Sequence, residues 1–213
     1  MSVKRWLPLS GIAFVALVIL AVVVLSGEHP ESDASGADVL SFYDSQMVRQ
    51  ALAGLVLAAS APFIVFFAMS FADRLWPAGE RRPLWERVLI GGSVVTAGAA
   101  IAGGWVHFAL ADGGDQGISP EAMQALNVLD SNVWLPVNSG LGVMMLGAAG
   151  SLLASGRLPR WLGWTALALG IGLFILFVDF VALILTLIWI IVLSVLLFRA
   201  AHESPRLAPD TAP

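Results

Sequence analysis

The chain has 213 residues, of which 58% are hydrophobic and 12% charged, with a formal net charge of −4. A typical soluble domain has about 25% charged and about 45–50% apolar residues, so a soluble globule of this size could not bury so much apolar surface. The absence of cysteine excludes disulfides, thiolate metal ligands and a cysteine nucleophile. No basic patch with interleaved aromatic residues indicates nucleic-acid binding. The composition therefore predicts an all-α integral membrane protein.

A helix needs about 20 mostly apolar residues to cross a bilayer. The first such stretch is 6–26, which carries no charge. A secretory signal peptide is the alternative, but the stretch is longer than a signal-peptide core and no cleavage site stands out, so we expect a retained helix. In the acidic segment 27–46, Ser35 and Asp38 resemble a capping box, which predicts a short helix that starts near Gly36.

The second predicted span is 47–72, and Pro62 inside it predicts a kink without a break. A charged turn at 73–87 leads to the third span at 88–111. Small residues recur there every four positions, on one helix face that would allow close backbone contact in lipid: Gly92, Thr96, Ala100 and Gly104. We therefore expect the third helix to be central in the bundle. A cavity lined by these small residues is the alternative interpretation.

Residues 112–132 are polar, and Ser119 with Pro120 is typical of a helix start. Apolar and polar residues after Pro120 fall on separate helix faces. This pattern predicts a short amphipathic helix at the outer membrane surface, as is also expected for the segment before the second span. The fourth predicted span is 134–154.

The stretch 161–198 is almost wholly apolar, with Asp179 as its only charge. One helix over this stretch would be about 57 Å long, nearly twice the thickness of the hydrocarbon core. We therefore expect a tight hairpin with Asp179 at its charged tip, although a buried Asp179 is the alternative. The fifth and sixth spans are then 161–178 and 180–198. The membrane domain covers 1–200, and a disordered tail covers 201–213.

The basic residues predict the orientation, because lysine and arginine favour cytoplasmic loops. The six-span topology with both termini in the cytoplasm places all but one of the 11 basic residues inside. The exception is Arg49. The acidic residues show the opposite preference, and ten of them fall on the outer side: Glu28, Glu31, Asp33, Asp38, Asp44, Asp112, Asp115, Glu121, Asp130 and Asp179.

Polar residues near the outer helix ends are the candidate site. Ionisable groups within membrane spans are costly and indicate function by default. We expect an outer vestibule, and a ligand site if one exists, at Arg49, His107, Asp130 and Asn138, with Gln46, Gln50, Asn127 and Asn132 nearby. His107 could relay protons or bind a metal, but an interfacial histidine that is hydrogen-bonded to a neighbour is the favoured interpretation. We predict no metal site and no cofactor.

Two segments resemble an actinobacterial family of small, six-helix integral membrane proteins that is classed as a domain of unknown function. One is Ser35-Gly36-Ala37-Asp38-Val39-Leu40-Ser41-Phe42-Tyr43, and the more distinctive is Gly156-Arg157-Leu158-Pro159-Arg160-Trp161-Leu162-Gly163-Trp164. The resemblance extends over most of the chain through the order of helices. It implies a bacterial plasma membrane and a six-helix topology, and it implies no substrate or catalytic residue.

The sequence lacks nucleotide-binding, zinc-binding and serine-hydrolase motifs. The leading hypothesis is a non-enzymatic structural, accessory or sensory protein. Its expected partners are the lipid bilayer and a second copy of the chain or another membrane protein. A small transporter or channel-like protein is the second hypothesis, and it would require polar residues at mid-membrane depth. A membrane enzyme that acts at the outer face is the third.

Overall fold

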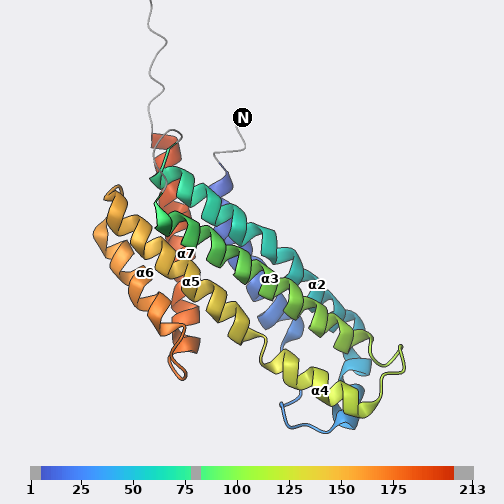
Figure 1. The fold of residues 1–213 in the computed structure, drawn as a ribbon. Coiled ribbons are helices and arrows are strands. Elements are labelled where there is room, and N and C mark those ends of the chain that lie inside the picture. Colours follow the sequence, from blue (N-terminus) through green and yellow to red (C-terminus); the bar gives the residue numbers. More distant parts are fainter. Residues whose placement is uncertain (1–5, 78–82, 204–213) are drawn as a thin grey trace, which may run out of the picture.

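The computed structural model describes residues 6–77 and 83–203, which form helices and contain no strand (Figure 1). Together they form a helix bundle, with the short helix α4 at one end. In chain order the elements are η2 (Leu7–Leu9), α1 (Ser10–Ile19), η3 (Leu20–Ser26), α2 (Gly36–Leu75), α3 (Leu84–Asp112), α4 (Pro120–Ser131), α5 (Trp134–Ser155), α6 (Arg160–Gly172) and α7 (Asp179–Glu203).

The first predicted span is confirmed as a continuous helical rod formed by η2, α1 and η3. Its last part, η3, is a π-helix, in which backbone bonds reach five residues back. The rod ends at Gly27, whose φ of +63° is a left-handed conformation that glycine adopts without strain. The amide of Gly27 donates to the Val22 carbonyl and closes the π-helical end.

Helix α2 begins where the capping box predicted. The Ser35 hydroxyl accepts a 3.3 Å hydrogen bond from the Asp38 amide and donates to the Asp38 carboxylate at 2.6 Å. The helix bends at Gln46, whose backbone leaves the helical region, and this bend separates a short first part from the long span. Pro62 lies inside the long span with helical backbone angles.

Helix α3 lies between α2 and α5, as the small residues predicted. A Cβ placed on Gly54 would lie 2.5 Å from the Gly104 carbonyl oxygen, so α2 and α3 meet backbone to backbone. On the other side, Gly92 faces the backbone of Met144 on α5. Gly98 points away from both neighbours, with no atom within 4 Å of its Cβ position. The small-residue face is therefore a packing face.

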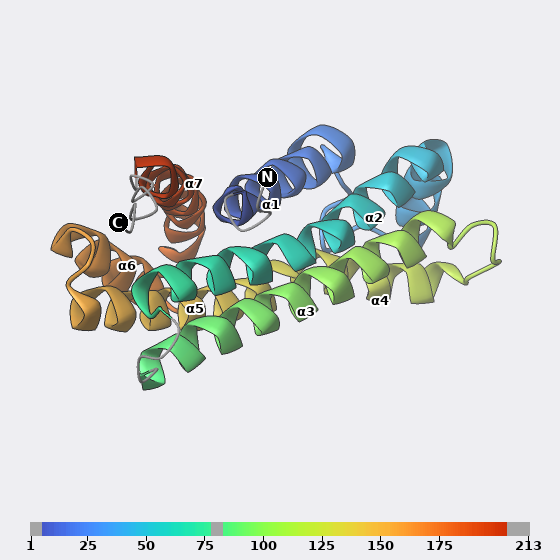
Figure 2. The same cartoon turned by 90° about the horizontal axis from the view of Figure 1, so that it is seen from above.

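Figure 2 shows α1 and α7 on the same side of the α2–α3 pair. The three helices α1, α2 and α7 meet at Gly11, which faces Ser194 and packs against Phe67. The main hydrophobic core contains buried residues from α1, α2, α3, α5, α6 and α7. Its largest side chain is Trp189 of α7, and the phenylalanines of α1 and α2 and the methionines of α5 are its other large buried side chains.

A second, smaller core lies at the end of the bundle that carries α4. It contains Val39, Tyr43, Leu110, Ala111 and Met123. We name residues 27–46 and 110–133 the acidic cap, because their charged side chains are all carboxylates. The predicted helix start at Ser119 is confirmed, since its hydroxyl accepts from the Ala122 amide.

The hairpin between α6 and α7 differs from the prediction. The turn occupies residues 173–178, and Asp179 is the first residue of α7 instead of the tip. Phe177, with a positive φ of 74°, is the most exposed residue of this turn at 96%. Asp179 is 6% exposed, so the expectation of a charged, exposed tip is wrong. Asp179 instead accepts a hydrogen bond from Asn138 of α5, and the turn itself contains only apolar residues.

Five helical stretches are long and apolar enough to cross a membrane: Leu7–Ser26, Gly36–Leu75, Leu84–Asp112, Pro120–Ser155 and Asp179–Ala200. Helix α6 has 13 residues, so it is shorter than the predicted span at 161–178, which the structure completes with the turn. The tail predicted at 201–213 lies outside the described residues except for the end of α7 at Glu203.

Candidate functional site

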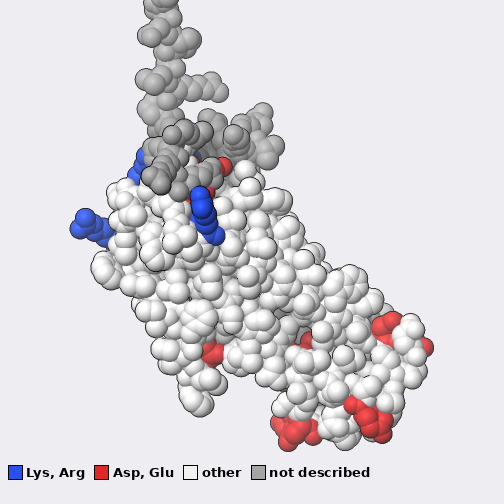
Figure 3. Space-filling view, in the orientation of Figure 1, with Lys and Arg blue, Asp and Glu red and all other residues white. Residues whose placement is uncertain are grey.

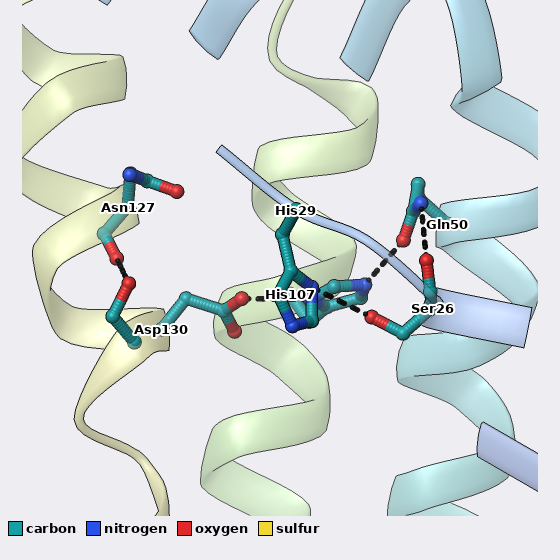
Figure 4. A network of polar contacts seen from close by, with 7 residues as sticks. Ser26, His29, Gln50, His107, Asn127 and Asp130 are labelled. Carbon is teal, nitrogen blue, oxygen red and sulfur yellow. Dashed lines mark hydrogen bonds and ion pairs between the residues drawn. The ribbon is translucent and has the colours of Figure 1, made fainter. Parts of the chain in front are cut away.

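His107 lies in the last part of α3, where the bundle meets the acidic cap (Figure 4). His107 is 6% exposed to solvent. The Nδ1 atom lies 2.8 Å from Oδ2 of Asp130 on α4, and the Nε2 atom lies 2.9 Å from Oε1 of Gln50 on α2. One imidazole ring therefore connects three helices. The sequence prediction that His107 and Asp130 come together is confirmed.

The hydrogen bonds indicate the protonation state of His107. The Nε2 atom of Gln50 donates to the Ser26 carbonyl at 3.1 Å, so the Gln50 amide oxygen must face His107. Both imidazole nitrogens consequently face acceptors, one a carboxylate and the other an amide oxygen. Only a doubly protonated ring donates in both directions. The geometry thus fits an imidazolium–carboxylate pair between α3 and α4.

The bonding continues into the segment after η3. The Ser26 hydroxyl lies 3.0 Å from Nδ1 of His29, and the Asn127 amide donates to the Glu31 carbonyl at 2.9 Å. The first contact holds the loop at 27–35 to the end of η3 (Figure 4), and the second attaches it to α4. We name Ser26, His29, Gln50, His107, Asn127 and Asp130 the His107 junction.

Two aromatic groups pack against the imidazole of His107. The Tyr43 ring meets it edge-on at a centroid distance of 5.8 Å, and the His29 ring at 6.4 Å. Partial burial lowers the pKa of His29 below its ordinary 6.5; the Asp130 carboxylate opposes this shift, and His107 adds to it. A neutral His29 can accept a hydrogen bond at Nδ1 from the Ser26 hydroxyl. Burial thus favours the neutral form of His29.

Arg49 does not join the junction, which corrects part of the predicted vestibule. Its side chain is exposed and donates to the Val24 carbonyl at 3.1 Å and to the Gln46 amide oxygen at 3.2 Å. Carbonyls at a helix C-terminus lack helical partners and carry partial negative charge. Arg49 binds such a carbonyl at the end of η3, which explains a basic residue on this side of the bundle. Arg157 binds the Leu75 carbonyl of α2 in the same manner at the opposite end.

Asn138 is also separate from the junction. It lies on α5, is 2% exposed, and donates from Nδ2 to Oδ2 of Asp179 at 3.4 Å. The structure therefore divides the four predicted site residues among three places. His107 and Asp130 form a pair, Arg49 binds the end of η3, and Asn138 belongs to a second buried polar site.

The sequence did not predict the roles of Ser26 and His29, and it placed Gln50 in the vestibule without a partner. Ser26 takes part through its backbone carbonyl and hydroxyl, which no side-chain pattern marks. Of the remaining vestibule residues, Asn132 donates from its side chain to the Val128 carbonyl one turn earlier in its own segment. Local spacing could not separate these cases, because the contacts of the junction join distant segments.

The chemistry open to the junction is limited by its bonding. The described residues contain no group of three or more histidine, cysteine, aspartate or glutamate side chains arranged to hold a metal ion. Two surface hollows lie beside Asp44 and Ser45, and His107 lines neither of them. The arrangement can position helices and respond to protonation.

Comparisons with known proteins add no family to this description. No family model matches the chain, and neither the curated proteins nor the solved structures contain a match. The resemblance to the actinobacterial six-helix family stays a prediction from the sequence.

Proposed function

We propose that this chain is a multi-pass protein of the bacterial plasma membrane that serves as a non-enzymatic structural, accessory or sensory component. The closed bonding of the His107 junction carries the proposal. The two ring nitrogens of His107 bond to Asp130 and to the Gln50 amide oxygen. The Gln50 amide nitrogen in turn donates to the Ser26 carbonyl. A group bonded in this way positions helices and offers no free base to a substrate.

The surface supports a membrane environment. Large apolar side chains are exposed along α1, η3, α2, α3 and α7, in positions where a soluble protein would expose charge; examples are Val23, Leu52, Val95 and Ile188. Five helical stretches meet the length and hydropathy needed for a span. We propose α6 as the sixth crossing, because α6 and α7 form an antiparallel hairpin, and α7 returns over the depth that α6 and the turn at 173–178 have covered (Figure 1).

The charge distribution supports an orientation with both termini inside. Apart from Arg49, the described arginines gather at one end of the molecule, and most of the described aspartate and glutamate residues lie at the other (Figure 3). The described basic residues at the first end are Arg74, Arg87, Arg157, Arg160 and Arg199. Because basic loops are retained in the cytoplasm, we propose that the acidic cap faces outward.

The transporter and the outer-face enzyme are weaker proposals. A transporter needs a polar route at mid-membrane depth, often beside a broken helix. At that depth α3 presents Thr96, which is fully buried and donates to the Gly92 carbonyl of its own helix. An enzyme needs an accessible acid or base, and the His107 junction is bonded internally. A partner membrane protein or a second copy of the chain fits the accessory role.

Cysteine labelling tests the topology, since the chain has no cysteine of its own. We expect a membrane-impermeant maleimide to label Gln116→Cys in intact cells and to label Ala154→Cys only after the cells are permeabilised. Both residues are exposed, and they lie at opposite ends of the bundle. Labelling of Ala154→Cys from outside in intact cells would overturn the orientation.

A third variant, Thr96→Cys, tests the closed bundle. We expect no reaction of this buried thiol with a small permeant thiol reagent in the folded protein, and full reaction after denaturation. Gln116→Cys serves as the matched positive control in the same preparation. Rapid labelling of folded Thr96→Cys would indicate a water-filled route and would favour the transporter.

A further inference from the structure

The second buried polar site consists of Asp179 and Asn138. Asp179 is 6% exposed at the start of α7, and its Oδ2 atom accepts from Nδ2 of Asn138 at 3.4 Å. No salt bridge reaches Asp179 from the described residues. Its environment is apolar, because the adjoining turn exposes Phe174, Ile175, Leu176 and Phe177 to the surroundings.

One acceptor of this site is unmatched. Asn138 is 2% exposed, and within the described part of the chain its Oδ1 atom has no hydrogen-bond donor. Buried polar atoms normally have a partner, and an unmatched one costs free energy. An ionised Asp179 cannot supply the partner, because a carboxylate only accepts hydrogen bonds.

We propose that Asp179 and Asn138 form a proton-binding site within the membrane-embedded bundle. A proton on Oδ1 of Asp179 would donate to Oδ1 of Asn138, while Nδ2 of Asn138 continues to donate to Oδ2 of Asp179. The carboxyl and carboxamide groups then form a cyclic pair in which each group donates once and accepts once. The bound proton gives the Asn138 oxygen a hydrogen-bond donor and also neutralises the buried Asp179 carboxylate.

Helix α3, which packs against α5, carries Glu86, Arg87, His107 and Asp112, of which His107 is bonded to Asp130 and Gln50. Helix α5 and the rod of η2, α1 and η3 contain no ionisable side chain. The charged residue of α6 is Arg160, at its opposite end, and the first basic residue of α7 is Arg199, more than five turns from Asp179. The N-terminus of α7 favours the ionised carboxylate. This effect is weaker than the cost of an unpaired charge in apolar surroundings.

The proton reaches the site from the aqueous phase on the side of the acidic cap, since the turn at 173–178 lies toward that end of the bundle (Figure 1). Binding and release would alter the contact between α5 and α7. The site does not share residues with the His107 junction, so this proposal stands independently of the proposed structural or sensory role.

Dicyclohexylcarbodiimide tests the site, because this apolar reagent reacts with protonated carboxyl groups in membranes. The carboxyl O–H adds across one C=N bond of the reagent, and acyl transfer to nitrogen then leaves a stable N-acylurea with no leaving group. In proteoliposomes of the full chain we expect labelling at Asp179, found by mass spectrometry. Above its midpoint the labelled fraction should fall about tenfold for each unit of pH.

The controls separate the alternatives. Exposed Asp115 should stay unlabelled, and Asp179→Asn should lose the label. Asn138→Leu, which removes the oxygen that accepts the proton of Asp179, should move the labelling midpoint to lower pH, whereas Ser139→Ala on the exposed face of α5 should not. Absence of labelling at every pH would overturn the proposal. Protection of Asp179 from labelling by sodium chloride but not by choline chloride would overturn it in favour of a sodium-binding site.

An infrared measurement gives an independent result without a reagent. We expect the full chain to show the carbonyl band of a protonated carboxyl group, and Asp179→Asn to lack it. A spectrum that shows only ionised carboxylates across the same pH range would overturn the proposal.

Discussion

His107 and Asp179 are both buried and ionisable, and both lie toward the end of the bundle that carries the acidic cap, but their hydrogen bonds differ. At His107 each ring nitrogen faces an acceptor, and the bonding continues through Gln50 to the backbone of Ser26. At Asp179 the partner amide of Asn138 keeps one unmatched oxygen. The matched site joins three helices through its hydrogen bonds, whereas the unmatched site has a position for a proton.

The same substitution should destabilise the protein strongly at Asp130 and only slightly at Asp179. Asp130→Asn leaves the His107 imidazolium without its carboxylate, and loss of one member of a buried ion pair costs about 3–5 kcal/mol. We expect a decrease of this size in the free energy of unfolding, measured by denaturation in mixed micelles. Hydrogen exchange should show the loss of protection in the acidic cap. The matched control is Asp115→Asn, an exposed acid, which should change stability by less than about 0.5 kcal/mol.

At the second site Asp179→Asn should change the free energy of unfolding by less than about 1 kcal/mol. The new amide can donate to Oδ1 of Asn138 and accept from its Nδ2, so it reproduces the protonated carboxyl. A loss as large as that of Asp130→Asn would indicate that Asp179 needs its charge. The contrast between the two sites would then fail.

The helix contact beside His107 provides a smaller perturbation. Gly54 lies one turn after Gln50, and its Cβ position is 2.5 Å from the Gly104 oxygen and 2.9 Å from the Phe108 nitrogen. Gly54→Ala should separate α2 from α3 and stretch the Gln50–His107 bond. Overpacking costs about 1–3 kcal/mol. The greater helix propensity of alanine recovers up to about 1 kcal/mol of it.

Gly98→Ala is the matched control for this contact, because its Cβ position is open and only helix propensity changes. It should leave the free energy of unfolding unchanged or slightly raised. Labelling of Asp179 should be the same in Gly54→Ala as in the parent chain, since the disturbance lies at α2 and α3. Equal destabilisation by both alanine variants would refute close packing at Gly54.

The sequence predicted the helices well because their signals are local. Apolar runs, the capping serines Ser35 and Ser119, and the small residues of α3 each act within a few turns of the chain. The turn before α7 was misplaced because Asp179, the only charge in an apolar stretch, suggested a solvated tip. Its partner, Asn138, lies 41 residues away on α5, and no local pattern reports that contact.

The candidate site was predicted in part for the same reason. Hydropathy gives the depth of a residue, and depth correctly grouped His107 with Asp130. It does not give the rotation of each helix, which directs Gln50 inward and Arg49, on the same helix, outward to the end of η3. Nor does it predict a backbone acceptor such as the Ser26 carbonyl, which fixes the orientation of the Gln50 amide.

The smallest expected effect concerns His29, whose pKa is lowered mainly by partial burial. The unfolded chain then binds more protons than the folded chain below about pH 6.5, so the contribution of His29 to stability is present above that pH and is lost as the pH falls. Much of the His29 side chain is exposed to solvent, and screening limits its contribution to the free energy of unfolding to less than about 1 kcal/mol.

His29→Asn should therefore flatten the acid side of the pH profile of unfolding. The charges that face His29 are Asp130 and His107, and the first of these opposes the shift. In an Asp130→Asn background the pKa of His29 should fall further, and the acid sensitivity of the cap should increase. An unchanged pH profile in both backgrounds would indicate that the loop at 27–35 does not report protonation, and the sensory role would then have to rest on the charged pair of His107 and Asp130 alone.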